Sequence, residues 1–214
     1  MKLFQRLATI FLLLVISRPA RADDSGSFVV RLGQDTTSVE HYVRTADRLE
    51  VDQVGRAPRT LRRHFLYDLK GGALTHVGTV FMPPGGSAPT QTIEATFDAD
   101  SLRAQIKNGN APAQDLRVGF PAGSIVVFSS SPWSVYEGQI MKLVKAKADT
   151  LGGVLYFMGA AAPERYRLRK LGRDSVEISN THGDLYHAAV DKSGRILGTL
   201  PIAGTAKFAI TRVQ

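Results

Sequence analysis

The strongest constraint on the fold is a hydrophobic pattern that repeats every second residue through most of the chain. In the segment RTLRRHFLYDL, alternate residues from Leu61 to Tyr67 are mostly apolar, and in RYRLRKL three arginines alternate with Tyr166 and Leu168. Successive side chains of a β-strand point to opposite faces, so this period predicts strands with one covered face. We therefore predict an all-β, mainly antiparallel fold, built as a curved sheet or half-barrel.

One segment, SSSPWSVYEGQIMKLVKAKADTLGG, has helical spacing instead. Its apolar residues, beginning with Trp133 and Tyr136, recur every three or four positions. Ser131 is a predicted N-cap, and Pro132 suits the first helical position. We predict one α-helix near 132–148 that covers the open face of the sheet. The sequence leaves open whether this helix is a fixed plug or a mobile lid over a cavity.

The first 22 residues have the pattern of a secretory signal peptide. Lys2 and Arg6 precede an apolar run of about ten residues, and Ala20-Arg21-Ala22 places small residues on the last and third-last positions before a cut. A membrane span needs roughly 20 apolar residues, and this run is much shorter. We predict cleavage after residue 22 and a periplasmic or extracellular location, with no transmembrane segment in the mature chain.

Residues 23–214 are enough for one domain with a hydrophobic core. We predict a single β-rich domain with strands in 28–128, then the helix, then strands in 154–213. The full chain has a formal charge of +8, but residues 1–22 contain four of its basic residues and no acidic ones. The other 23 basic and 19 acidic residues give a charge of +4, which does not predict a nucleic-acid partner.

Two similar motifs, RLGQDTTSVE and KLGRDSVE, each link two alternating segments near opposite ends of the chain. We interpret both as hairpin turns. Gly33 and Gly172 are then predicted to take the positive φ that tight turns require. This interpretation gives the aspartates of the two motifs a place in a turn and no catalytic role.

The sequence has no motif that predicts catalysis, a metal or a cofactor. It contains no cysteine, no G-x-S-x-G elbow and no S-x-x-K pair. Its five histidines lack the close spacing of common zinc ligands. We therefore predict no catalytic residue, no metal and no cofactor. The alternative is a hydrolase, which requires that two or more of four histidines converge with an acid in one cleft. These are His41, His64, His76 and His187.

The closing stretch LYHAAVDKSGRILGTLPIAGTAKFAITRV has an apolar strand, an Asp-x-x-Gly-Arg turn, a leucine-rich strand and a last strand that ends on Arg. FVVRLGQDTTSVEHYVR is similar to the first hairpin of secreted β-domains of unknown function. Together with the single helix, this layout resembles the open half-barrel superfamily of periplasmic lipoprotein carriers. The resemblance implies a curved sheet around an apolar hollow, in which such carriers shield acyl chains. No residue of this chain matches their functional positions, so the resemblance assigns no site.

We predict a non-enzymatic binding or scaffold domain that holds an apolar or amphiphilic ligand, such as a lipid, in this hollow. Arg63 lies in a cluster of arginines that suits an anionic head group. A further alternative is an envelope module whose sheet edge pairs with a protein partner. The predicted ligand-binding residues are Trp133, Tyr136, Phe65, Tyr67, Phe97 and Phe157 in the hollow, and Arg63 at the head group.

Overall fold

A computed structural model of the protein describes most of the chain beyond its first 23 residues. The predicted signal peptide over 1–22 lies outside the described residues. Within the described part of the chain, no helix is both long enough and apolar enough to cross a membrane. The described ranges are 24–56, 60–98, 101–119, 125–127, 132–157, 164–204 and 207–213.

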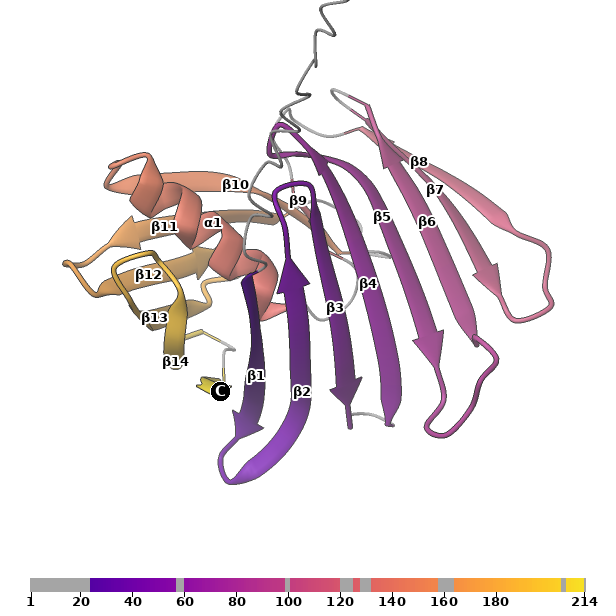
Figure 1. Ribbon diagram of the computed structural model, residues 1–214, viewed down its shortest axis with the longest axis horizontal. Helices are drawn as coiled ribbons and strands as arrows, with labels where there is room; N and C mark the ends of the chain where they lie inside the picture. The colour runs from indigo at the N-terminus through magenta and orange to yellow at the C-terminus, as the bar shows by residue number, and fades with distance from the viewer. Residues whose placement is uncertain are drawn as a thin grey trace, which may run out of the picture.

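The first half of the protein is an antiparallel meander, drawn in indigo to magenta in Figure 1. Each strand pairs with its neighbours in the sequence from β1 to β8. Antiparallel strands need only short turns between them, as the turn residues of the sequence predict. The strands are β1 (Asp24–Leu32), β2 (Asp35–Arg44), β3 (Arg48–Gly55), β4 (Leu61–Lys70), β5 (Ala73–Met82), β6 (Gln91–Phe97), β7 (Ser101–Asn108) and β8 (Gln114–Gly119).

The second half contains the helix and a second meander. β9 runs parallel to β10, and the strands from β10 to β15 are antiparallel. β15 then pairs with β1, which joins the two halves into one 15-stranded sheet. The elements are β9 (Ile125–Val127), α1 (Trp133–Lys145), β10 (Thr150–Phe157), β11 (Glu164–Lys170), β12 (Ser175–Asn180), β13 (Leu185–Val190), β14 (Ile196–Ala203) and β15 (Phe208–Val213).

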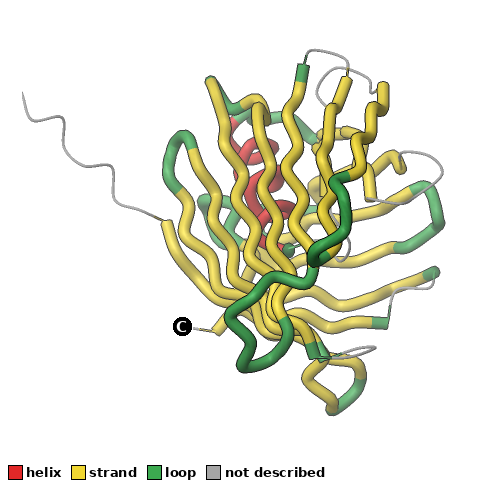
Figure 2. The backbone as a smooth tube through the Cα atoms, turned by 90° about the vertical axis from the view of Figure 1, so that its right-hand side faces the viewer, coloured by secondary structure: helices red, strands yellow, loops and turns green. Residues whose placement is uncertain are grey.

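The sheet is curved and open. Its strand order runs from β8 through β1 and β15 to β9, so β8 and β9 are its edges. The described residues show no pairing between these two edges. Figure 2 shows α1 inside the curve of the sheet. This arrangement confirms the predicted fold class, a curved and mainly antiparallel sheet with one covering helix.

The burial of the strands follows the period of two that the sequence shows. Exposed and buried residues alternate along the whole of β3. In β11, Tyr166 and Leu168 are buried and the arginines beside them are exposed. In β2, however, the buried residues include Glu40 and Tyr42, while Val39 is exposed. A carboxylate tolerates this position because α1 supplies hydrogen-bond donors for it.

The helix begins at Trp133 and ends at Lys145, slightly inside the predicted range. Pro132 is the N-cap rather than the first helical residue, because its ψ of 131° is not helical. The predicted N-cap, Ser131, lies outside the described residues. After the last turn Lys147 takes a φ of 54°, the left-handed conformation that commonly ends a helix.

Only one of the two predicted turn glycines has a positive φ. Gly33 has a φ of 60° and is the first residue of the two-residue turn between β1 and β2. A positive φ at this position is typical of a type II′ turn. The prediction for Gly172 is wrong, since its φ is not positive. The β11–β12 loop spans residues 171–174 and therefore does not need the tight two-residue geometry.

The hydrophobic core lies between the concave face of the sheet and α1. Ile140 and Leu143 of the helix are fully buried. The core cluster includes Phe28 and Phe65 from the first meander and Leu168 from the second. One continuous core therefore holds both halves of the sheet together.

Candidate functional site

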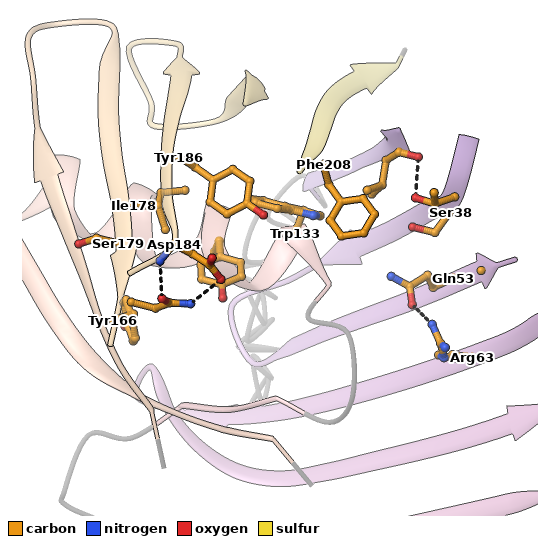
Figure 3. A pocket seen from close by; sticks show the side chains of 15 residues that line it. Ser38, Gln53, Arg63, Trp133, Tyr166, Ile178, Ser179, Asp184, Tyr186 and Phe208 are labelled. Carbon is orange, nitrogen blue, oxygen red and sulfur yellow. Dashed lines mark hydrogen bonds between the residues drawn. The ribbon is translucent and has the colours of Figure 1, made fainter. Parts of the chain in front are cut away.

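A cavity of about 320 Å³ lies at the N-terminal end of α1, between the two halves of the sheet (Figure 3). Its lining residues come from β1 to β4 on one side and from β11 to β13 on the other, with β15 between them. Trp133 and Tyr136 of the helix complete the lining. Small-molecule sites have volumes of roughly 300–1,000 Å³, so this cavity is at the lower end of their range.

Aromatic side chains form one wall of the cavity. The ring of Trp133 lies 5.3 Å from that of Tyr136 and 5.3 Å from that of Tyr186, measured between centroids. Tyr136 in turn lies 6.5 Å from Tyr166 in an edge-to-face arrangement. Figure 3 shows Trp133 between Tyr186 and Phe208, which also lines the cavity. Such rings present a large apolar surface together with polar groups at their tips.

The spacing of these residues along the helix and the strands explains why their rings lie on the side of the cavity. Trp133 and Tyr136 are three residues apart on α1, so they share one face of the helix. Tyr166 and Ile178 lie on the buried faces of β11 and β12, where side chains alternate. Burial raises the pKa of the Tyr166 hydroxyl, and it raises the pKa of Tyr186 to about 12, so both rings stay neutral at ordinary pH.

Polar side chains lie across the cavity from one another. Arg63 Nη1 donates to Gln53 Oε1 at 3.0 Å, and the two residues are opposite each other on β4 and β3. Burial lowers the pKa of Arg63, but a guanidinium stays protonated in proteins. On the other side, Asn180 Nδ2 donates to Asp184 Oδ2 at 3.2 Å. The cavity therefore has a cation on one wall and a carboxylate on the other.

Glu40 fixes the beginning of the helix beside the cavity. Its carboxylate is fully buried and accepts hydrogen bonds from the backbone N–H groups of Trp133 at 2.7 Å and Ser134 at 2.9 Å. A carboxylate at this end is favoured by the helix dipole and satisfies donors that have no partner within the helix. Burial, opposed by these hydrogen bonds, raises the pKa of Glu40 to about 7. Glu40 thus positions the backbone of Trp133.

Glu137 joins the helix to three strands. Its fully buried carboxylate accepts hydrogen bonds from the Tyr42 hydroxyl, the Arg212 guanidinium and, at 2.8 Å, the backbone N–H of Ile196. Arg44 Nη1 donates at 3.3 Å to Oε1, the same carboxylate oxygen that accepts from Tyr42. These partners belong to β2, β14 and β15. A single carboxylate on α1 therefore binds both meanders.

Arg44 extends this polar network. It donates to the backbone oxygen of Ser134 at 2.6 Å and to Asp24 at 2.8 Å. Asp24 is also 2.8 Å from Arg195, at the turn before β14. Buried polar groups of this kind are stable when each has a partner, and the network gives the helix several. It favours a helix that is a fixed plug over a mobile lid.

Three of the predicted ligand-binding residues line the cavity, namely Trp133, Tyr136 and Arg63. Phe65 and Tyr67 do not line it. They share a face of β4 with Arg63, but each lies further along the strand, where the core covers it. Their rings stack on each other with 6.3 Å between centroids.

Of the other two predicted residues, one lies away from the cavity and one cannot be assigned from the described residues. Phe97, at the end of β6, is partly buried against the core and is not among the lining residues. The side chain of Phe157, in β10, lies outside the described part of the structure. Several other lining residues were not among the predicted ones. These include Gln53, Tyr166, Ile178, Asp184, Tyr186 and Phe208.

The histidines of the hydrolase alternative lie on the convex face of the sheet, opposite the buried residues of their strands. His64 Nδ1 is 3.1 Å from Asp52, and His76 lies between Asp68 and Glu94 at 3.1 and 2.8 Å. No histidine is among the described residues that line the cavity. In the described ranges, no group of three or more His, Asp or Glu side chains is placed to hold a metal ion.

Comparison with known proteins supports the fold. The fold is similar to that in the crystal structure of a β-barrel-like protein of the domain of unknown function DUF1849 from Brucella abortus, with a TM-score of 0.52. The likeness covers 90% of this chain and 96% of that chain at 8% sequence identity, so it concerns the fold alone. No protein-family model and no curated protein matches the sequence. The protein is therefore a β-barrel-like protein with an open sheet.

Proposed function

We propose that the protein is a non-enzymatic binding domain for an apolar or amphiphilic ligand. The observation that carries this proposal is the cavity, in which the rings of Trp133 and Tyr186 lie across from Arg63 (Figure 3) and Tyr136 also belongs to the lining. Apolar surface with a few polar groups is the usual lining of a small-molecule site. An acyl chain or ring lies against the aromatic wall, and an anionic group meets Arg63.

The volume of the cavity limits the ligand. About 320 Å³ is near the minimum for a small-molecule site and is too small for a whole phospholipid with two chains. The ligand is therefore a single-chain amphiphile, or a larger one of which only part enters. Its anionic group is a carboxylate or phosphate, because both match the planar donor fork of arginine.

Two features of the sequence support the type of ligand and the location that we propose. The resemblance to the periplasmic lipoprotein carriers supports a ligand with an acyl chain. The signal-peptide pattern over 1–22 supports a periplasmic or extracellular location. Binding in such a compartment needs no cofactor, and the proposal includes none.

The proposal is tested by native mass spectrometry of the protein purified from a bacterial periplasm, followed by solvent extraction of the bound molecule. We expect a bound amphiphile, with its occupancy lowered about tenfold by Arg63→Gln, because a charge-assisted hydrogen bond is lost. Tyr186→Ala should also lower it. The control is Arg103→Gln, which changes an exposed arginine of β7 away from the cavity. A ligand-free wild-type protein, or equal occupancy in all variants, would contradict the proposal.

A further inference from the structure

The end of the sheet beside the cavity presents apolar side chains to solvent. Leu32, at the end of β1, is directly opposite Phe208, at the start of β15, and their side chains are 43% and 39% exposed. Ile202, near the end of β14, is 51% exposed, and its neighbour Pro201 is opposite Tyr186 of the aromatic wall. Phe208 itself lines the cavity. Leu32, Ile202 and Phe208 are here named the apolar rim.

Cationic side chains flank the apolar rim. Arg31 precedes Leu32, and Lys207 precedes Phe208, while two more arginines stand at the β3–β4 connection. All four side chains are exposed. Within the described ranges none of them forms an ion pair. The four cations are Arg31, Arg56, Arg62 and Lys207.

The acids at this end balance only part of the positive charge. Asp35, in the first position of β2, is exposed. Glu164 lies 2.6 Å from His182, and Asp184 accepts a hydrogen bond from Asn180. The surface around the opening of the cavity therefore combines apolar tips with an excess of positive charge.

We propose that this end of the protein docks on the surface of an anionic lipid bilayer. The apolar rim enters the boundary between head groups and acyl chains, and the four cations contact the anionic head groups. An acidic protein would also satisfy the cations. A bilayer supplies, in addition, the acyl chain that the aromatic wall of the cavity takes; this preference rests on the proposed function. Phe208 is exposed in the apolar rim and also lines the cavity, so an acyl chain from the bilayer would enter the cavity from this end.

The opposite end of the sheet offers matched control positions. Leu197 is 49% exposed on the same strand as Ile202, five residues or roughly 16 Å away along β14. Leu171, in the β11–β12 loop, is also exposed. Lys192 and Arg173 are exposed cations in turns at that end. Changes at these positions remove the same chemistry from a surface that faces away from the cavity opening.

The test is co-sedimentation of the protein with vesicles of equal parts phosphatidylglycerol and phosphatidylcholine, compared with vesicles of phosphatidylcholine alone. We expect binding to the anionic vesicles that weakens as salt rises, because salt screens the head groups. The double variant Leu32→Ser with Ile202→Ser should bind about tenfold or more weakly. Arg31→Glu with Lys207→Glu should do the same.

The control variants separate docking through this end of the protein from nonspecific adsorption to vesicles. Leu171→Ser with Leu197→Ser, and Arg173→Glu with Lys192→Glu, should bind like the wild type. No wild-type binding to anionic vesicles, or equal loss in rim and control variants, would overturn the inference. Leu32, Ile202, Arg31 and Lys207 are not lining residues, and native mass spectrometry of the same variants reports the cavity separately. Docking and ligand binding can therefore fail independently of each other.

Discussion

At the residue scale, Glu40 links the ionisation of one side chain to the position of Trp133. Its carboxylate has no exposed surface and caps the first N–H groups of α1. Burial raises its pKa from 4.5 to about 7, so the folded protein binds a proton more tightly than the unfolded chain does. Between pH 4.5 and 7 the folded state therefore carries more protons, and stability falls as the pH rises through this window.

Because stability falls with rising pH in this window, we can predict the effect of Glu40→Gln, which keeps the shape of the protonated side chain. Relative to this variant, the wild type should lose up to about 3 kcal/mol of unfolding free energy between pH 4.5 and 7, and little more above pH 7. Urea unfolding at a series of pH values measures the difference. If the wild type instead gained stability over the variant as the pH rose, the hydrogen bonds to Trp133 and Ser134 would outweigh burial.

At the scale of elements, α1 is held by side chains that no pattern within the helix predicts. The helical spacing of the sequence predicts its existence and its buried face, including Ile140 and Leu143. The spacing does not predict its cap, because the capping carboxylate belongs to Glu40, 93 residues before Trp133. The alternation of β2 is equally ambiguous, since Val39 and Tyr42 lie on opposite faces of that strand. Only the packed position of α1 shows which face of β2 is covered and which is exposed.

The contacts of Glu137 predict how strongly α1 contributes to the stability of the protein. Glu137→Gln should lower the free energy of unfolding by about 3 kcal/mol or more, because Arg212 and Arg44 lose the buried carboxylate between them. Glu177→Gln is the matched control. It removes a carboxylate that pairs with the half-exposed Arg169 and should cost about 1 kcal/mol or less. Urea unfolding of both variants checks this, and equal losses would contradict the role given to Glu137.

At the scale of the whole molecule, the pairing of β1 with β15 decides where the cavity forms. This contact joins the first and last described strands and places Phe208 beside Val30 and the aromatic wall. The sequence predicts the strands, because the period of two is a local property. It does not predict which strands from the two ends will meet. For the same reason local patterns could point to Trp133, Tyr136 and Arg63, which line the cavity, but not to Phe208.

Two residues that we predicted at the ligand site, Phe65 and Tyr67, do not line the cavity, and the reason is related. Phe65 and Tyr67 share a face with Arg63, and a pattern of period two cannot show how deep each lies along a strand. The core covers Phe65 and Tyr67, whereas Arg63 lies nearer the start of β4, at the cavity. The similar fold of the DUF1849 protein, at 8% identity, shows that a very different sequence can form this kind of sheet. The fold is therefore more predictable from the sequence than the site is.

Binding of an amphiphile in the cavity can be followed through Trp133, because it is the only tryptophan in the chain. The measurement is quenching of its fluorescence by a bromine-substituted acyl carboxylate. The account predicts saturable quenching, with a dissociation constant about tenfold higher in Arg63→Gln and unchanged in Arg103→Gln. Quenching that never saturates, or that is the same in both variants, would contradict binding in this cavity.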